Sequence, residues 1–174
     1  MLKVILSGAC GRMGAQVTSL AESRNVKIVA GVDVNIRSDM PYPVYPDFSL
    51  VTEAADAIID FSRPEGLHAI LQYALAKKLP CVLCATGYNE SDLAAIKDAA
   101  KEIPVFRSAN MSLGVYVLKT LCARAAQMLP EYEIEIVEKH HNQKLDAPSG
   151  TAVMLYDAVA SETSEAVHGR HGRT

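Results

Sequence analysis

The stretch "LKVILSGACGRMGAQVTSLAES" (residues 2–23) decides the fold of this chain. It opens with an apolar, β-branched run and continues with apolar residues that recur at helical spacing. Between the two lies "GACGRMG", with glycines at positions 8, 11 and 14. A strand, a glycine turn and a helix in this order begin the doubly wound α/β folds, where the turn can approach a dinucleotide pyrophosphate.

Further along the chain, short apolar runs alternate with helical patterns. The apolar runs predict buried strands over residues 26–33, 56–62, 80–86 and 103–109. Residues 64–78 predict a helix with one apolar stripe, and residues 89–102 predict a helix that opens with a polar cap. This alternation predicts a parallel sheet with helices on both faces. Residues 35–49 contain three prolines and predict a loop.

The pattern changes after residue 110. Residues 111–130 predict a longer helix whose inward side chains are Val117, Leu118, Leu121, Cys122 and Ala125. Apolar residues and glutamates alternate over 131–136, which predicts a strand with one exposed face. Such a strand does not belong to a sheet that is covered on both faces. We therefore expect a Rossmann-type dinucleotide-binding domain over residues 1–110 and a smaller, incomplete α+β domain over 111–174, with the boundary between 108 and 113.

Composition narrows the classes of partner. The chain has 174 residues, of which 49% are hydrophobic, enough for one full domain and part of another. Its net charge of −3 gives no electrostatic reason to expect nucleic acid or an anionic membrane surface as partner. No apolar run in the sequence approaches the roughly 20 residues that span a bilayer. We therefore expect a cytoplasmic protein with a small-molecule partner.

The cysteines and histidines predict neither a redox pair nor a metal site. Cys81 and Cys84 form a C-x-x-C, but they fall in a predicted buried strand, where an odd separation points the two side chains to opposite faces. We interpret them as packing residues. A metal bound by the histidine pair at 140–141 together with His168 and His171 is the weaker hypothesis, because no second tight cluster with ligand spacing appears.

The glycine turn is the first candidate site. Its spacing is a variant of the dinucleotide fingerprint, and Asp33 follows about 20 residues later, at the end of the next predicted strand. An acid there can hold the ribose hydroxyls of NADH and repels a 2′-phosphate, whereas Arg37 nearby favours NADPH. Arg12 either lies along the cofactor or faces solvent. Glycines that only make a turn are the alternative.

Two later segments also end strands at the carboxyl edge, where open α/β sheets bind ligands. They are "CATG" (84–87) and "SANMS" (108–112). Their backbone groups can contact the nicotinamide side of a cofactor, and Asn110 can hydrogen-bond to it. Plain strand-end turns are the alternative interpretation for both segments.

The segment "EKHHNQKLDAPSGTA" (138–152) carries the second candidate site. Hydride transfer to a double bond must be followed by a proton, and histidine carries one near neutral pH. Lys144 supplies a fixed cation, and residues 149–151 at a helix start offer N–H groups to a carboxylate. Ordinary surface histidines are the alternative, and Asp146 is expected to shape the turn.

Taken together, these motifs resemble those of the dihydrodipicolinate reductase family. The resemblance covers essentially the whole chain, and the motifs that carry it are "GACGRMG", "DFSRPEG", "CATGY", "SANMSLGV" and above all "EKHHNQKLDAPSGTA". It implies a Rossmann domain and a smaller α+β substrate domain, usually in a homotetramer. It also implies NADH- or NADPH-dependent reduction of 4-hydroxy-tetrahydrodipicolinate, a dicarboxylate, to tetrahydrodipicolinate in the diaminopimelate route to lysine.

The resemblance also implies roles for individual residues. The proton donor falls on His140, and a second catalytic residue falls on Lys144. The positions implied or offered for substrate binding are His141, Ser149, Gly150 and Thr151. The implied cofactor-binding positions are Gly8, Ala9, Cys10, Gly11, Arg12, Met13, Asp33, Cys84, Ala85, Thr86, Ser108, Ala109, Asn110 and Met111.

Two features depart from the family pattern. Cys84 stands where the family commonly has glycine, which crowds the nicotinamide side slightly. After "VHGRHGRT" the family continues with further strands and a closing helix, so we expect this sequence to lack part of the second domain and to leave strand edges exposed. The alternatives are a related nicotinamide dehydrogenase for another amino-acid-derived anion, and a non-catalytic NAD-binding or assembly module.

Overall fold

The computed structural model describes residues 1–142 and 147–162. Lys144, Asp146, His168 and His171 therefore lie outside the described residues. The chain divides into two compact units, Met1–Ser108 and Ala109–Thr174, and each is described by itself. Among the helices that the structure describes, none combines the length and the apolar character needed to cross a membrane.

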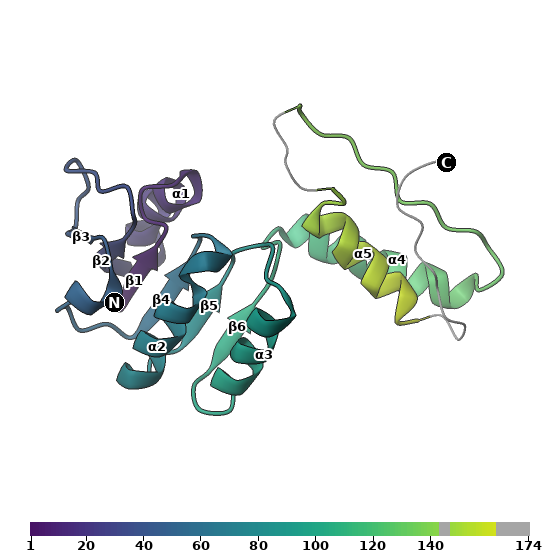
Figure 1. Cartoon of the computed structure of the whole chain (residues 1–174). Helices are drawn as coiled ribbons and strands as arrows, with labels where there is room; N and C mark the ends of the chain where they lie inside the picture. The colour runs from purple at the N-terminus through teal and green to yellow at the C-terminus, as the bar shows by residue number, and fades with distance from the viewer. Residues whose placement is uncertain (143–146, 163–174) are drawn as a thin grey trace. The chain divides into compact units, whose positions relative to one another are not determined.

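The first unit is a parallel six-stranded sheet with the order β3-β2-β1-β4-β5-β6 (Figure 1). Its strands are β1 (Leu2–Ser7), β2 (Val26–Val32), β3 (Val44–Tyr45), β4 (Ala57–Asp60), β5 (Cys81–Leu83) and β6 (Val105–Arg107). Its helices are α1 (Arg12–Ala21), α2 (Leu67–Lys77) and α3 (Glu90–Ala99), with short 3-10 turns at Glu22–Arg24, Phe48–Leu50 and Pro64–Gly66. The strand order reverses between β1 and β4, which is where open α/β sheets bind ligands.

Both faces of this sheet are covered, as the continuous apolar runs predict. Successive side chains of a strand point to opposite faces. Accordingly, Ile5 belongs to the larger buried cluster, with side chains of α2 and α3. Its neighbours Val4 and Leu6 belong to a second buried cluster that includes Ala21 of α1. The prediction of a Rossmann-type α/β fold is confirmed.

The helices of this unit follow local sequence signals. The apolar stripe predicted for residues 64–78 is confirmed in α2, which buries Leu67, Ile70, Leu71 and Ala74. The predicted polar start of the next helix is a capping box in α3. There the Asn89 side chain accepts from the Asp92 N–H at 2.9 Å, and the Asp92 carboxylate accepts from the Asn89 N–H at 3.0 Å.

The prediction of a loop over residues 35–49 is wrong in one part, because this segment contains strand β3. The Gly31 N–H donates to the Pro43 carbonyl at 2.8 Å, and the Asp33 N–H donates to the Tyr45 carbonyl at 3.0 Å. Prolines flank the two-residue strand on either side. Proline is tolerated at a sheet edge, where its missing N–H costs no ladder hydrogen bond, so a proline-rich segment can still add an edge strand.

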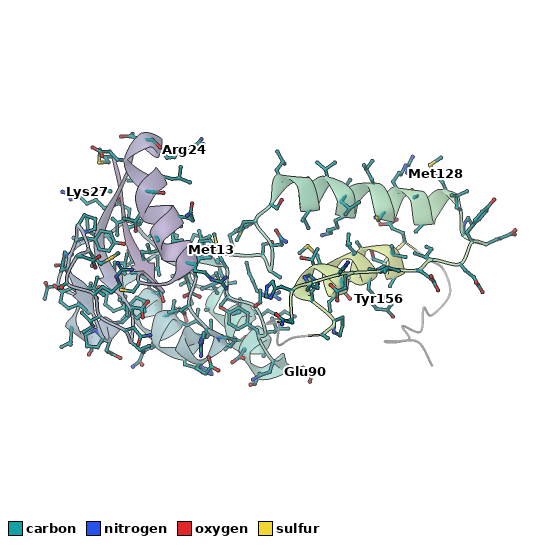
Figure 2. The ribbon with its side chains drawn as sticks, turned by 90° about the horizontal axis from the view of Figure 1, so that it is seen from above. Met13, Arg24, Lys27, Glu90, Met128 and Tyr156 are labelled. Atoms are coloured by element: carbon teal, nitrogen blue, oxygen red, sulfur yellow. The ribbon has the colours of Figure 1, made fainter. Side chains whose placement is uncertain are left out.

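In the described part of the second unit, α4 (Leu113–Met128) and α5 (Gly150–Ala160) pack side by side (Figures 1 and 2). The strand predicted over 131–136 is wrong, since this segment begins in a turn, where the Tyr132 N–H donates to the Leu129 carbonyl at 3.2 Å, and continues without strand pairing. The inward apolar face predicted for α4 is also wrong: Leu121 is 62% exposed, and Ala126 is the buried residue of the helix. A strand needs a paired neighbour, and the described residues of this unit provide none.

Candidate active site

The glycine turn between β1 and α1 brings the backbone of the first unit into very close contact. Gly8 has φ +73°, and a Cβ there would lie 2.7 Å from the Phe61 carbonyl carbon and oxygen. A Cβ at Gly14 would lie 2.3 Å from the Ala9 carbonyl oxygen. Helix α1 therefore starts directly on the turn, and its N-cap Gly11 brings no side chain to cap the first N–H groups. An uncapped helix start of this kind presents N–H donors and the positive end of the helix dipole to an anion.

Asp33 lies beside this turn, just after β2. The Cys10 N–H donates to Asp33 Oδ2 at 2.9 Å, and the Asn35 N–H donates to Oδ1 at 2.9 Å. The structure therefore brings together two predicted cofactor-binding elements that are more than 20 residues apart in the chain. A carboxylate has about four acceptor positions, so these two hydrogen bonds leave capacity for ribose hydroxyls.

Arg37, which the sequence analysis weighed as a site for a 2′-phosphate, is paired within its own loop. Its Nε and one Nη donate to the two carboxylate oxygens of Asp39 at 3.0 and 2.6 Å. This bidentate pair raises the pKa of Arg37 and lowers the pKa of Asp39. The positive charge is therefore largely compensated by a neighbour before any nucleotide binds.

Arg12 and Met13 follow the turn as the first two residues of α1, where Figure 2 labels Met13. Both side chains are exposed, that of Met13 to 48%. Cys10 is partly buried, and burial raises the pKa of its thiol. A protonated thiol adds no charge to the turn. The anion-binding character of this element therefore comes from its backbone and from the exposed cation of Arg12.

A buried carboxylate, which the sequence analysis missed, organises the ends of β4 and β5. Asp60 is fully buried; its Oδ1 accepts from the Ser62 N–H at 2.9 Å and its Oδ2 from the Tyr88 hydroxyl at 3.4 Å. The Asp60 carbonyl also accepts from the Cys84 N–H at 2.9 Å. The predicted cofactor segment Cys84, Ala85 and Thr86 is thus attached to the end of β4 through its backbone, and Tyr88, two residues after the segment, adds a side-chain hydrogen bond.

Cys81 and Cys84 are free thiols in this region. Burial, with a smaller contribution from the negative charge of Asp60, raises the pKa of each thiol to about 12. Cys81 is fully buried in β5, while Cys84 lies just beyond the strand and is partly buried. Thiols with such a high pKa are poor nucleophiles and poor metal ligands near neutral pH, which agrees with their interpretation as packing residues.

The segment Ser108–Met111 crosses from the first unit into the second. The Ser108 N–H donates to the Leu83 carbonyl at 3.2 Å, so Ser108 continues the edge of the sheet. Within the second unit, the Asn110 amide donates to the Thr151 hydroxyl at 3.0 Å, and Asn110 Oδ1 accepts from the Ser112 N–H at 2.8 Å. Asn110, a predicted cofactor-binding residue, is therefore hydrogen-bonded to Thr151, a predicted substrate-binding residue.

The start of α5 is capped within the chain. Ser149 is buried, and its hydroxyl accepts from the Ala152 N–H at 3.1 Å. The Ser149 N–H donates to Glu138 Oε1 at 2.9 Å. Helix geometry leaves the N–H groups of Gly150 and Thr151 without an intrahelical acceptor, so these two are the donors that a carboxylate can reach.

His140 is joined to the same helix start by Glu138. The His140 Nε2 lies 2.8 Å from Glu138 Oε2, and the two side chains are 40% and 29% exposed. Hydrogen bonds from Ser149 and then from His140 lower the pKa of Glu138 to about 2. Glu138 is another residue that the sequence analysis missed, although its place two residues before His140 was available as a signal.

The other two predicted residues of the histidine segment are His141 and Lys144, and the structure describes only His141. His141 is exposed. Lys144 lies outside the described residues, so its role as second catalytic residue stays a prediction. In residues 1–142 and 147–162, no group of three or more His, Cys, Asp or Glu side chains has the arrangement of a metal site.

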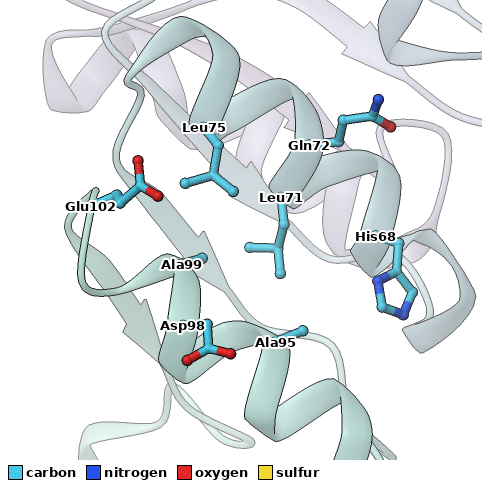
Figure 3. A pocket seen from close by; sticks show the side chains of 8 residues that line it. All are labelled: His68, Leu71, Gln72, Leu75, Ala95, Asp98, Ala99 and Glu102. Carbon is cyan, nitrogen blue, oxygen red and sulfur yellow. The ribbon is translucent and has the colours of Figure 1, made fainter.

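A groove of about 440 Å³ lies between α2 and α3, away from the predicted residues (Figure 3). Leu71, Leu75, Ala95 and Ala99 form its apolar part, and the residues with polar groups are His68, Gln72, Asp98 and Glu102. Both carboxylates are already paired, Asp98 with Lys101 at 2.7 Å and Glu102 with Lys78 at 2.8 Å. The groove shares no residue with the candidate site.

Comparison with known proteins agrees with this arrangement in both units. The model of the dihydrodipicolinate reductase N-terminus matches residues 2–111, and the model of its C-terminus matches residues 114–173. The 4-hydroxy-tetrahydrodipicolinate reductase of Clostridium perfringens is 43% identical over 99% of this chain and 70% of its own length. That of Caldanaerobacter subterraneus is 47% identical over 100% of this chain and 70% of its own length.

Solved structures share the fold. A dipicolinate-bound dihydrodipicolinate reductase from a Paenisporosarcina species superposes with a TM-score of 0.77 at 24% identity, over 100% of this chain and 71% of its own. An oxidoreductase from Agrobacterium radiobacter, in complex with NAD+, superposes with a TM-score of 0.54 at 18% identity over 75% of this chain and 40% of its own. Since both family models match and the reductases are similar over essentially the whole of this chain, this chain belongs to the dihydrodipicolinate reductase family.

Proposed function

We propose that this chain carries the dinucleotide site and the proton-donating segment of an NAD(P)H-dependent reductase. Its substrate is 4-hydroxy-tetrahydrodipicolinate, which it converts to tetrahydrodipicolinate in the diaminopimelate route to lysine. The observation that carries the proposal is the His140–Glu138–Ser149 arrangement at the start of α5, in a chain that belongs to this family. The dipicolinate in the Paenisporosarcina structure supports a cyclic dicarboxylate as the class of substrate.

The residues of the first unit fit a dinucleotide. A side chain at Gly8 or Gly14 would collide with backbone atoms, so these positions of the turn carry no side chain at the uncapped start of α1. The turn from Gly8 to Met13 would hold the pyrophosphate at the uncapped start of α1, where the N–H groups of Arg12 and Met13 are the available donors, because those of Gly8, Ala9, Cys10 and Gly11 already donate within the chain. Asp33 would accept from the ribose hydroxyls. The turn at Cys84 to Thr86 and the segment Ser108 to Met111 would hold the nicotinamide side. When bound, the reduced nicotinamide supplies a hydride.

The residues of the second unit supply the proton that must accompany the hydride and the groups that bind the substrate. Replacing the 4-hydroxyl of the substrate by hydrogen needs a hydride and a proton, and the hydroxyl leaves as water. We assign the proton to His140, with Lys144 as a fixed cation and second catalytic residue. The N–H groups of Gly150 and Thr151, with His141 nearby in sequence, bind a ring carboxylate, because a helix start favours an anion. Asn110 keeps Thr151 in place through its amide.

Both NADH and NADPH are part of the proposal. Asp33 favours NADH, because its carboxylate beside the turn repels a 2′-phosphate. Arg37 can receive that phosphate only in competition with Asp39. A homotetramer, as the family resemblance implies, also belongs to the proposal. Apolar side chains that are exposed on α4 and over 132–137, such as Leu121 and Ile134, supply surface for contacts between subunits.

Turnover tests the proposal. The substrate is generated in situ from pyruvate and aspartate semialdehyde, and NADH consumption is followed. We expect His140→Ala to lower kcat by about 10²- to 10⁴-fold, the usual contribution of a general acid, with the NADH Kd nearly unchanged. Lys144→Ala should lower kcat and raise the substrate KM. His68→Ala, which removes an exposed histidine of α2, serves as the matched control.

The alternative of a non-catalytic NAD-binding module predicts a different result. In that case NADH binds, as its own fluorescence reports, but the substrate causes no consumption. If His140→Ala turned over at the parent rate while the parent chain was active, the assignment of the proton donor would be wrong.

A further inference from the structure

Glu138 joins three parts of the second unit through one carboxylate. It ends the extended segment that follows α4, and it lies two residues before His140 and 11 residues before Ser149. Its Oε1 accepts from the Ser149 N–H at 2.9 Å, and its Oε2 lies 2.8 Å from His140 Nε2. The proposed proton donor is thereby connected to the residue that caps the proposed carboxylate-binding helix start.

The charge of this carboxylate determines what His140 can do. With a pKa of about 2, Glu138 is ionised at any pH where a biosynthetic reductase works. An ionised carboxylate only accepts hydrogen bonds, so His140 Nε2 must carry a hydrogen. In the neutral imidazole, Nδ1 is then the nitrogen without a hydrogen, and a proton passes to and from the ring at Nδ1.

We propose that Glu138 is the positioning residue of His140: it fixes the imidazole as the Nε2–H tautomer and directs Nδ1 as the proton-exchanging atom beside the start of α5. This inference rests on the proposed function for its catalytic consequence, but its structural part stands without turnover. Carboxylate partners fix the tautomer and orientation of metal-ligating histidines in this way, and their removal there typically costs about 10- to 100-fold in metal affinity or activity.

Glu138→Gln separates this role from simple capping of the helix. The glutamine carbonyl oxygen can still accept from the Ser149 N–H, so the cap is kept. Its NH₂ group then faces His140 Nε2 and can only donate, which favours the opposite tautomer with hydrogen on Nδ1. A residue that only caps α5 would tolerate this change, whereas a positioning residue would not. Glu133→Gln makes the same chemical change at an exposed position of the same segment and is the matched control.

Two measurements decide the inference. The first is the ¹⁵N spectrum of the histidine side chains of the apo chain at mildly alkaline pH, with the His140 signals identified by their loss in His140→Gln. The chain has five histidines, so this identification is practicable. We expect the Nε2–H tautomer in the parent and in Glu133→Gln, and a shift toward the Nδ1–H tautomer in Glu138→Gln.

The second measurement is steady-state turnover. Glu138→Gln should lower kcat by about 10- to 100-fold and leave the NADH KM within about twofold, while Glu133→Gln behaves as the parent. An unchanged tautomer in Glu138→Gln overturns the inference, whether or not kcat falls. A changed tautomer with parental kcat overturns the catalytic part. If the parent chain itself consumes no NADH, the proposed function fails, and the tautomer measurement still decides the role of Glu138.

Discussion

The hydroxyl of Tyr88 donates to the buried carboxylate of Asp60 across 3.4 Å and so connects the turn after β5 to the end of β4. Burial, followed by the negative charge of Asp60, raises the pKa of Tyr88, so the hydroxyl keeps its proton. The other oxygen of Asp60 accepts from the Ser62 N–H at 2.9 Å. One carboxylate therefore holds two of the loops that border the proposed nicotinamide site.

Tyr88→Phe should destabilise the first unit and weaken cofactor binding. The substitution leaves one oxygen of a fully buried carboxylate without its hydroxyl donor, and we expect a loss of about 1 kcal/mol in the free energy of unfolding. Urea denaturation followed by circular dichroism measures this loss, and NADH fluorescence measures binding. Tyr116→Phe, at a tyrosine that is 62% exposed, is the control and should have almost no effect. Equal behaviour of the two variants would contradict a structural role for the Tyr88 hydroxyl.

Gly14→Ala should separate α1 from the glycine turn. The added Cβ would lie 2.3 Å from the Ala9 carbonyl oxygen and 2.4 Å from that of Gly8, so the backbone must move. Overpacking of this kind costs about 1–3 kcal/mol, and a displaced turn should also weaken NADH binding. Thermal unfolding and an NADH titration measure the two effects. Gly114→Ala is the control, because its Cβ would lie at an ordinary 3.6 Å from the Ser112 hydroxyl and alanine favours a helix. The prediction is contradicted if Gly14→Ala binds NADH as tightly as Gly114→Ala does.

Asp39→Asn should shift the nucleotide preference toward NADPH. Arg37 donates two hydrogen bonds to Asp39, and the loss of the negative charge frees the guanidinium for a 2′-phosphate. We expect the ratio of kcat/KM for NADPH to that for NADH to rise, and the gain to shrink as salt screens the phosphate contact. Asp98→Asn, on α3, breaks a comparable surface pair with Lys101 just after the helix and is the control. An unchanged ratio in Asp39→Asn would show that Arg37 does not reach the nucleotide.

The pH dependence of the second unit should reveal the Glu138 carboxylate. Its pKa is about 2 in the folded chain against an ordinary value of 4.5, so the folded state binds this proton less readily than the unfolded state. The resulting stabilisation is fully present above about pH 4.5 and is lost as the pH falls toward about 2. The amide chemical shift of Ser149, which donates to this carboxylate, should therefore stay constant between about pH 5 and about pH 3.5, where an ordinary glutamate titrates. A Ser149 amide that titrates with a midpoint near the ordinary value would contradict the hydrogen bond.

Features that depend on neighbours in the sequence could be predicted well. The strand, turn and helix over residues 2–23 follow from apolar periodicity and from glycines that a close backbone approach requires. The buried stripe of α2 and the capping box of α3 are likewise local, since their residues lie one helical turn apart. The same holds for Ser149 as the N-cap of α5.

Features that depend on a partner far away in the chain could not be predicted from the sequence. The segment 131–136 has the alternation of a half-exposed strand but no strand beside it among the described residues, so it forms no strand and stays exposed. Strand β3 was missed for the opposite reason: its two residues pair because β2 offers an edge, although prolines surround them. Apolar periodicity reports which face could be buried, and it does not report whether another element is there to bury it.

The sequence by itself determined the Rossmann-type unit, the glycine turn and the histidine segment before α5, because apolar periodicity or spacing within a short stretch encodes each of them. The hydrogen bond between Asp33 and the turn, 23 residues away, came from the tertiary structure. Only the tertiary structure decided that Asp60 meets Tyr88 and that Glu138 meets both His140 and Ser149. Asp60 and Tyr88 are 28 residues apart in the chain, and Glu138 and Ser149 are 11 residues apart. Spacing alone does not report such contacts. A hydrogen bond forms when folding brings a donor and an acceptor within about 3 Å, and that distance is a property of the packed chain rather than of either residue.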